Sequence, residues 1–343
     1  MRIEEEIKLD YSDVLFRPKR STLKSRKEVD LNRNYKFKYS NFEWEGIPII
    51  ASNMDGVGEL KVAETLAEYK IMTALTKHHS LAKIQNFPNI KKIYPYVSLS
   101  FGTDHKAYET VKNTLKELNF FQFICIDIAN GYSDHFSKFI SSVRDDFPNK
   151  TIIAGNVVTA DMTQELILSG ADIVKVGIGP GSACTTRLQT GVGYPQLSAV
   201  IECSDAAHGL SAHIIADGGC TCPGDVSKAY GGGADFVMLG GMLAGHNEGG
   251  GKIIEENNKK FVEFYGSSSE TALDKHYGGL LDYRSSEGRL VKIPYKNSLK
   301  NTINDILGGV RSSCTYVGAQ SLKQLSKCTT FVRVGKQYNN IFV

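Results

Sequence analysis

The stretch that decides the fold runs from Thr151 to Arg187 and reads TIIAGNVVTADMTQELILSGADIVKVGIGPGSACTTR. Two short apolar runs that contain β-branched residues, 151–157 and 173–177, flank a segment, 160–169, whose apolar residues have helical spacing. A strand, a helix and a second apolar strand in succession predict two parallel strands joined by a crossover helix. The second strand leads directly into a glycine-rich loop that contains a cysteine.

The same unit recurs along most of the chain. Eight apolar runs predict strands, at 47–52, 71–75, 96–100, 123–128, 151–157, 173–177, 213–217 and 236–240. Helical spacing lies between them, at 59–69, 106–118, 133–147, 160–169, 195–207 and 222–230. This alternation predicts an α/β protein with a (β/α)₈ TIM barrel as its core, over about residues 47–246. A doubly wound open sheet is the alternative, but it typically has one glycine-rich turn after its first strand.

The barrel leaves an N-terminal arm and a long C-terminal segment. In the latter, residues 252–265 predict a hairpin with Asn257-Asn258 at its turn. Residues 277–292 are polar and punctuated by glycine, as in a mobile flap over a site. Because no low-complexity tract or linker interrupts the pattern, we expect a single catalytic domain over residues 1–343.

Composition excludes several classes of protein. Hydrophobic residues make up 41% and charged residues 22% of the 343, which is ordinary for a globular chain and excludes wholesale disorder. No apolar run is long enough to span a bilayer, and the start MRIEEEIKLD lacks the apolar stretch of a signal peptide. A net charge of only +3, with its charges interspersed, argues against nucleic acid as a partner. Seven cysteines without a secretory signal indicate reduced thiols and a cytoplasmic location.

Glycine marks the working region. The chain has 33 glycines, and 18 of them lie between Gly177 and Gly251. Glycine serves where the backbone takes a positive φ or approaches a ligand closely. In a (β/α)₈ barrel the active site is built from the loops that follow the strands, and these glycines fall largely in such loops.

The loop Gly177–Arg187 is the most informative of these. Its run Gly179-Pro-Gly-Ser182 turns backbone amides and carbonyls towards the site, which suits the binding of an ion or a phosphate. Most lone cysteines are small buried thiols. Cys184, however, lies in an exposed loop beside hydroxyl and guanidinium groups, so we interpret it as a nucleophile that forms a covalent intermediate.

Two further turns suit a phosphate. Asp217-Gly-Gly219 and Gly240-Gly241 follow the seventh and eighth strands, where barrels of this kind often bind phosphate. Asp217 is suited to hold a ribose diol; tight turns without a ligand are the alternative interpretation. Cys220 and Cys222 lack the second pair of a zinc site, and adjacent His78 and His79 rarely face one metal, so no structural zinc is expected.

Long strings of the sequence resemble one family. They include GPGSACTTRLQTGVGYPQ at 179–196, DGGCTCPGD at 217–225, FVMLGGM at 236–242 and ILGGVRSSCTYVG at 306–318. On these strings the chain resembles the IMP dehydrogenase and GMP reductase family over nearly its whole length, and within it the reductase branch. The paired regulatory module usual in the dehydrogenases would lie near residues 90–105, and the chain has no room for that insert.

The resemblance implies an activity: NADPH-dependent reductive deamination of GMP to IMP with release of ammonia, a step of purine salvage. Cys184 would attack purine C2 and form a covalent thioimidate, and Thr186, Glu287 and Lys77 would relay protons. It also implies a homotetramer and a monovalent cation, potassium.

The site residues that the resemblance implies are these. For GMP they are Ser182, Asp217, Gly218, Gly219, Gly240, Gly241, Gly266, Ser267, Ser268, Arg284, Ser285, Ser286 and Gly288. For NADPH they are Ser25, Arg26, Lys77, Asp127, Ile128, Ala129, Gly179, Tyr283, Ser312, Ser313, Cys314 and Thr315, with Ser25 and Arg26 reaching the cofactor of a neighbouring subunit. For potassium they are Gly179, Gly181, Cys184 and Arg187.

Three positions depart from the family pattern. Ser267 stands where methionine is usual, Gly56 where threonine is usual, and the string 76–79 keeps Lys77 and His78 but has Thr76 and His79 at its ends. Two alternatives stay open. One is an IMP dehydrogenase, which oxidises IMP to XMP with NAD⁺, and the other is a non-catalytic barrel that senses purine nucleotides.

Overall fold

The centre of the molecule is a closed parallel barrel. The computed structural model describes residues 1, 3–279 and 285–335, and its eight barrel strands follow the order β10-β11-β4-β5-β6-β7-β8-β9. Their bounds are β4 Ile49–Ala51, β5 Met72–Leu75, β6 Val97–Phe101, β7 Phe123–Asp127, β8 Thr151–Val157, β9 Ile173–Val176, β10 His213–Asp217 and β11 Phe236–Leu239. The predicted (β/α)₈ barrel is thus confirmed and the open-sheet alternative is wrong.

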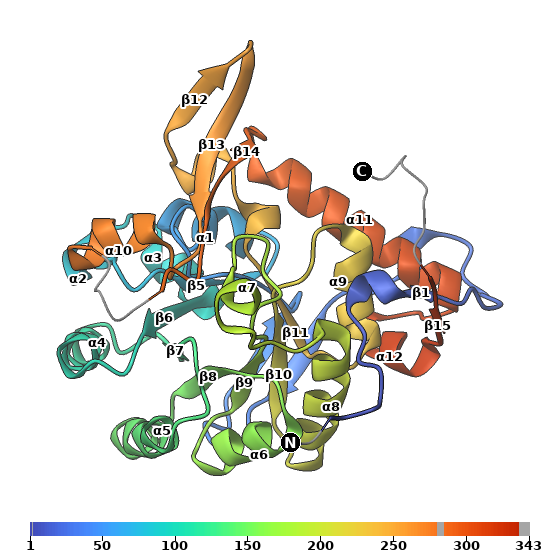
Figure 1. The fold of residues 1–343 in the computed structure, drawn as a ribbon, viewed down its shortest axis with the longest axis horizontal. Helices are drawn as coiled ribbons and strands as arrows, with labels where there is room; N and C mark the ends of the chain where they lie inside the picture. The colour runs from blue at the N-terminus through green and yellow to red at the C-terminus, as the bar shows by residue number, and fades with distance from the viewer. Residues whose placement is uncertain (2, 280–284, 336–343) are drawn as a thin grey trace.

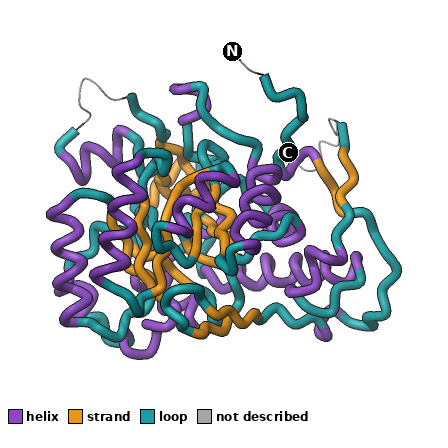
Figure 2. The backbone as a smooth tube through the Cα atoms, turned by 90° about the horizontal axis from the view of Figure 1, so that it is seen from below, coloured by secondary structure: helices purple, strands orange, loops and turns teal. Residues whose placement is uncertain are grey.

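Helices surround the barrel, as Figure 2 shows. The six that the sequence predicted are α1 Leu60–Ala67, α4 His105–Glu117, α5 Asp134–Asp146, α6 Ala160–Leu168, α8 Gln196–Gly209 and α9 Pro223–Gly231. Helix α5 illustrates why they form: Phe136, Ile140 and Val143 recur at helical spacing and are fully buried against the strands. The short helices α2 Leu81–Gln85, α3 Ile90–Ile93 and α7 Thr186–Thr190 were not predicted.

The N-terminal arm closes one end of the barrel. Strands β2 (Arg33–Lys36) and β3 (Glu43–Gly46) form a hairpin that carries Tyr35 and Trp44, and Phe37 follows β2. The Tyr35 ring lies 4.8 Å from the ring of Phe236, the first residue of β11, and Phe37 lies 5.5 Å from Phe123, the first residue of β7. These buried rings fill the barrel at the N-terminal ends of its strands, so a ligand has access only from the C-terminal end.

The C-terminal segment adds a small sheet that projects from the barrel (Figure 1). Strands β12 (Ile253–Glu256) and β13 (Lys259–Tyr265) form the predicted hairpin, with Asn257 and Asn258 at positive φ in its turn. Helix α10 (Glu270–Tyr277) follows it. The expected flap over 277–292 is corrected in part: β14 (Leu290–Pro294) pairs with β13, so the end of that segment is a strand of the sheet.

The remaining elements tie the two ends of the chain to the barrel. Strand β1 (Val14–Phe16) pairs with β15 (Phe331–Arg333), and the long helix α11 (Leu299–Val317) packs against α9. Short elements complete the fold: η1 Tyr11–Asp13, η2 Arg26–Glu28, η3 Tyr94–Tyr96, η4 Gly241–Leu243, η5 Asn247–Gly249, η6 Leu322–Gln324 and α12 Leu325–Cys328. None of the described helices combines the length and the apolar character needed to span a membrane.

Two adjacent glycines of α11 differ in their surroundings, and this difference predicts opposite effects on stability. A Cβ at Gly309 would lie 2.4 Å from Cβ of Pro223, whereas a Cβ at Gly308 would meet nothing within 4 Å. We therefore expect Gly309→Ala to lower the free energy of unfolding by about 1–3 kcal/mol, because it overpacks the contact between α11 and α9. The matched control Gly308→Ala should raise it by up to about 1 kcal/mol, because alanine favours a helix. Urea denaturation measures both, and equal effects of the two variants would contradict this packing.

Candidate active site

One cavity opens at the C-terminal end of the barrel strands and gathers most of the predicted site residues. Its lining includes Asp127, Ile128, Ala129, Gly179, Gly181, Ser182, Cys184, Thr186, Asp217, Gly218, Gly219, Gly240, Gly241, Gly266, Ser267, Ser268 and Glu287. These residues come from loops after β7, β9, β10 and β11 and from the C-terminal segment. In the barrel order, β7 lies opposite β11, so the residues 127–129 face the turn Gly240-Gly241 across the mouth.

A chain of three polar side chains begins at the cysteine. The Cys184 thiol donates to the Thr186 hydroxyl over 3.2 Å, and that hydroxyl donates to Oε2 of Glu287 over 2.7 Å. Thr186 is the first residue of α7, two residues after Cys184, whereas Glu287 is 101 residues further along the chain. The arrangement connects a thiol to a carboxylate through one hydroxyl, which is a geometry suited to moving a proton between them.

Backbone hydrogen bonds hold the glutamate segment against the cysteine loop. The amide of Thr185 donates to the Glu287 carbonyl over 2.9 Å, and the amide of Arg289 donates to the Ala183 carbonyl over 3.0 Å. The Arg289 guanidinium donates to the carbonyl of Ser182 over 2.9 Å. Residues 287–289 thus extend the cysteine loop like an added strand. Glu287 is fixed by main-chain contacts that do not depend on its own side chain.

The glycine turns bring the backbone close to the cavity. Gly218 and Gly219 have φ of +90° and +84°, a conformation that other residues rarely adopt. At Gly241 a Cβ would lie 2.9 Å from Oγ of Ser182, so a larger residue would fill the space between this turn and the cysteine loop. These turns leave amides and open volume at the ends of β10 and β11, which suits a phosphate or another anion.

A buried lysine that the sequence analysis did not single out lies beneath the cavity. Lys175, on β9, has a side chain that is only 2% exposed, and it forms ion pairs with Asp127 and with Asp217. Burial by itself opposes its charge, but the two carboxylates raise the pKa of Lys175 above its ordinary value. Its ammonium in turn offsets the burial of Asp127 and holds the pKa of that carboxyl below its usual range. Asp127 therefore presents a carboxylate to the cavity at neutral pH.

Two asparagines complete this network. Asn53 donates to Oδ2 of Asp127 over 3.0 Å, and Asn156 donates to Oδ2 of Asp217 over 2.8 Å. Asn156 also lines the cavity, and within the described residues its buried Oδ1 has no hydrogen-bond partner. The sequence alone does not single out Asn53 or Asn156, because no local pattern shows which aspartate each one contacts.

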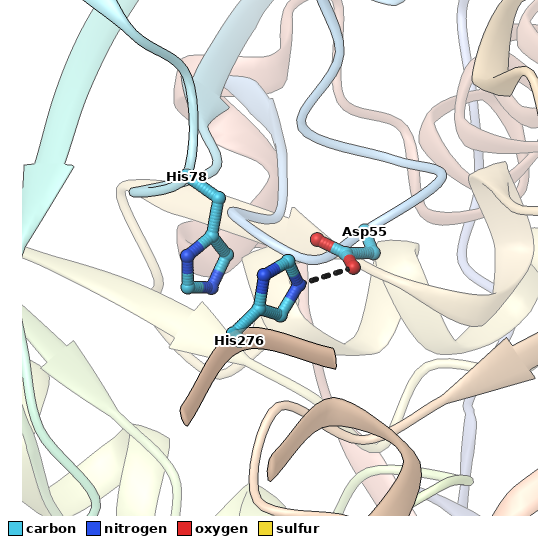
Figure 3. A group of neighbouring side chains, drawn as sticks. All are labelled: Asp55, His78 and His276. Atoms are coloured by element: carbon cyan, nitrogen blue, oxygen red, sulfur yellow. Dashed lines mark hydrogen bonds and ion pairs between the residues drawn. The ribbon is translucent and has the colours of Figure 1, made fainter. Parts of the chain in front are cut away.

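Lys77 does not line the cavity. It follows β5, and its ammonium lies 5.3 Å from the ring centroid of Tyr277, the last residue of α10. Beside it, the ring of His78 stacks on the ring of His276, with centroids 3.4 Å apart and planes 2° apart (Figure 3). The same short segment therefore binds the end of α10, from which the chain continues towards Glu287.

Asp55, in the loop after β4, holds α10 from the other side (Figure 3). Its Oδ2 accepts hydrogen bonds from Tyr265 over 2.7 Å, from Lys275 over 2.8 Å and from His276 over 2.7 Å. Burial raises the pKa of this carboxyl, but the three donors outweigh burial and hold the pKa of Asp55 well below its usual range. Burial and the neighbouring His276 lower the pKa of His78 to about 4, so its stacked ring is neutral at neutral pH.

Asp55, His78 and His276 also have ligand atoms within 4.8 Å of one another, which raises the question of a metal. A metal ion binds an imidazole nitrogen in the plane of the ring. Because the two rings stack in parallel planes, no ion lies in both. The Lys275 ammonium, in addition, already occupies Oδ2 of Asp55. The cluster is therefore a structural latch between the β4 loop, the β5 loop and α10.

Other predicted residues lie away from the cavity. Ser25 and Arg26 are at η2, which packs against α11, the helix that carries Ser312, Ser313, Cys314 and Thr315. Ser286 and Gly288 flank Glu287, and Ser285 donates to Gln189 over 3.1 Å. The guanidinium of Arg187 donates to Asp10 and to the Tyr194 carbonyl. Tyr283 and Arg284 fall outside the described residues.

The fold and the site together define a (β/α)₈-barrel enzyme with a cysteine, a threonine and a glutamate aligned at its mouth. Comparison with known proteins agrees. Residues 8–339 match the model of the IMP dehydrogenase / GMP reductase domain. The chain is 60% identical to a GMP reductase of Vibrio atlanticus and 59% identical to those of Aliivibrio fischeri and Escherichia coli O81. Each alignment covers 100% of this chain and 99% of the relative. The chain therefore belongs to the IMP dehydrogenase / GMP reductase family, whose members are oxidoreductases.

The latch at Asp55 predicts a pH-dependent contribution to stability. We expect Asp55→Asn to lower the free energy of unfolding at pH 7 by about 1–3 kcal/mol, because it weakens charged hydrogen bonds to α10 and β13. Since the folded-state pKa of Asp55 is depressed, this contribution is present above the ordinary carboxyl pKa and is lost as the pH falls below it. Chemical denaturation at pH 7 and at pH 2.5, which lies below the ordinary carboxyl pKa, checks both statements.

The matched control is Glu256→Gln, which alters an exposed ion pair with Lys292 in the hairpin. It should change the free energy of unfolding by less than about 0.5 kcal/mol at either pH. If the two acid-to-amide variants behaved alike, Asp55 would not have the role of a latch.

Proposed function

We propose that this protein is a GMP reductase that converts GMP to IMP and ammonia with NADPH. The observation that carries the proposal is the contact series from the Cys184 thiol through Thr186 to Glu287, located in a cavity with glycine turns for a nucleotide. The names of the full-length relatives support the same reaction. The reaction serves purine nucleotide salvage.

The proposed first step forms a covalent thioimidate. The sulfur of Cys184 bonds to purine C2, and the bond from C2 to the exocyclic nitrogen breaks. The thiol proton passes through the Thr186 hydroxyl to Glu287, whose carboxyl then returns a proton to the departing nitrogen, so that neutral ammonia leaves. Thiol and aminopurine thus become thioimidate and ammonia, with no proton gained or lost. The 3.2 Å and 2.7 Å contacts support this route.

The cavity suits a purine nucleoside monophosphate. The glycine turns at 218–219 and 240–241 offer a site for the phosphate, together with Ser182 and the backbone at 266–268. The Asp217 carboxylate, oriented by Asn156, suits the two hydroxyls of a ribose. Ser267 also lines the cavity, so its departure from the family pattern leaves a side chain at the site.

The same cavity fits the nicotinamide end of the cofactor. NADPH, when bound, supplies the hydride that replaces sulfur at C2. Asp127, Ile128 and Ala129 line the side of the mouth opposite the turn after β11, whereas Gly179 follows β9, next to the turn after β10. The ionised Asp127 accepts hydrogen bonds and is suited to a carboxamide group. The adenosine end would extend beyond the cavity to the surface where η2 packs against α11, and this surface carries Ser25, Arg26 and Ser312–Thr315. A neighbouring subunit would supply this surface, which is the basis for proposing a homotetramer.

Potassium is a further part of the proposal. In the described part of the chain the carbonyls of Gly179 and Cys184 accept no hydrogen bond, so they are free for a cation, whereas the Gly181 carbonyl accepts the amide of Cys184. Backbone carbonyls are the ligands that potassium prefers. The Arg187 side chain is itself a cation, so only its backbone belongs to this ligand set. A cytoplasmic location is consistent with the free state of all seven cysteines.

The experiment that tests the proposal separates the three candidate functions. Protein mixed with GMP and NADPH should consume NADPH, measured by absorbance at the nicotinamide band, and release one ammonia for each NADPH oxidised. Turnover only with IMP and NAD⁺ would instead identify an IMP dehydrogenase. Binding of GMP without turnover in either direction would identify a sensor. NADH in place of NADPH measures the cofactor preference.

Removal of the nucleophile should separate chemistry from binding. Cys184→Ala is expected to abolish turnover, because no covalent intermediate forms, while GMP still binds within about threefold of the wild-type Kd, since the turns and Asp217 are intact. Steady-state kinetics and calorimetry measure the two effects. The control Cys222→Ala removes an exposed thiol outside the cavity and should leave turnover unchanged. Residual turnover in Cys184→Ala would exclude the covalent route.

A further inference from the structure

The deepest charged group of the site is the ammonium of Lys175. It is fully enclosed by the barrel and contacts two carboxylates that belong to different halves of the cavity: Asp127 on the cofactor side and Asp217 on the substrate side. An isolated buried ammonium would be strongly unfavourable, and the two partly buried carboxylates would repel each other without a cation between them. The three charges therefore stabilise one another, and removal of any one of them would leave the others without compensation.

The strand register explains how one lysine reaches both partners. Asp127 is paired with Gly155 across β7 and β8, and Gly155 is paired with Lys175 across β8 and β9. A Cβ at Gly155 would lie 2.5 Å from Cβ of Lys175. Because the middle position has no side chain, Lys175 extends over β8 to Asp127. Its other neighbour, β10, ends at Asp217.

We infer that Lys175 is a positioning residue that couples the two halves of the site: its single ammonium orients both the carboxylate that receives the ribose of the substrate and the carboxylate that receives the nicotinamide end of the cofactor. This inference rests on the proposed function. It predicts that loss of one charge, at a residue that touches neither ligand, weakens the binding of both.

The positive charge between Asp127 and Asp217 comes from Lys175, because the buried thiols and the phenol nearby are neutral. Burial raises the pKa of Cys125, on β7, to about 12, and burial also raises the pKa values of Tyr11 and Cys220, near Asp217, well above their ordinary values. These three groups are neutral between pH 6 and pH 9. Lys77 acts on Asp127 from the exposed side. Without Lys175, the two partly buried carboxylates would repel each other, which favours the retention of a proton by one of them.

The test compares Lys175→Met, which keeps an unbranched chain of similar length without charge, with Lys175→Arg, which keeps the charge. Calorimetry gives the Kd of GMP and, separately, of NADP⁺ at pH 7 and at pH 9. In Lys175→Met we expect both Kd values to rise at least tenfold at pH 7. We expect them to recover in part at pH 9, relative to wild type, because the retained proton is then lost. Lys175→Arg should lie closer to wild type than Lys175→Met for both ligands.

The outcomes distinguish the possible failures. If the wild-type protein bound neither GMP nor NADP⁺, the proposed function itself would fail. If the wild type bound both and Lys175→Met weakened only one, or neither, the coupling would be refuted. A loss for both ligands that was equal at pH 7 and pH 9 would refute the electrostatic role and leave a packing role.

Should Lys175→Met not fold, a cross-site comparison takes its place. In Asp127→Asn the Lys175 ammonium keeps only its ion pair with Asp217. The Kd of GMP should then change at least threefold, although Asp127 lies on the cofactor side. Asp217→Asn should likewise change the Kd of NADP⁺. If each substitution affected only the ligand on its own side, Lys175 would not couple them.

Discussion

Closure of the barrel between β11 and β4 is the constraint on which the site depends. Because the eight strands are parallel, closure brings all eight C-terminal ends to one mouth, and the rings of Tyr35, Phe37 and Trp44 fill the opposite end. Residues far apart in the chain thus converge without any direct sequence signal between them. The cysteine loop after β9, the turns after β10 and β11 and the acidic end of β7 face one cavity for this reason.

The C-terminal segment supplies the part of the cavity lining that the barrel loops do not. Strand β14 pairs with β13, so that the residues just before it, 287–289, are aligned against the cysteine loop. Helix α10 is fixed at one end by Asp55 and by the stacked rings of His78 and His276. Glu287 therefore owes its position to the pairing of β14 with β13 and to the backbone contacts of its own segment with the cysteine loop.

Much of this could be predicted from the sequence, because the signals are local. Apolar runs marked all eight strands, and the glycine-rich string around Cys184 marked the loop that lines the cavity. Resemblance to the family supplied Glu287, which by itself looks like a surface carboxylate. Features that depend on contacts between distant residues could not be predicted. Strand β14 lies in a polar stretch, and nothing in the sequence around Asp55 or His276 shows that their side chains meet. Lys175 did carry a local signal, since a lysine inside a buried apolar strand requires a carboxylate partner.

The separation of 101 residues between Thr186 and Glu287 has a consequence for how the protein is made. During synthesis the chain emerges from its N-terminus, so Cys184 and Thr186 leave the ribosome well before the segment that carries the glutamate. Barrel strands can pair during that interval, but the thiol has no carboxylate to exchange a proton with. The order of the chain thus delays assembly of the reactive centre until the scaffold beneath it has been translated.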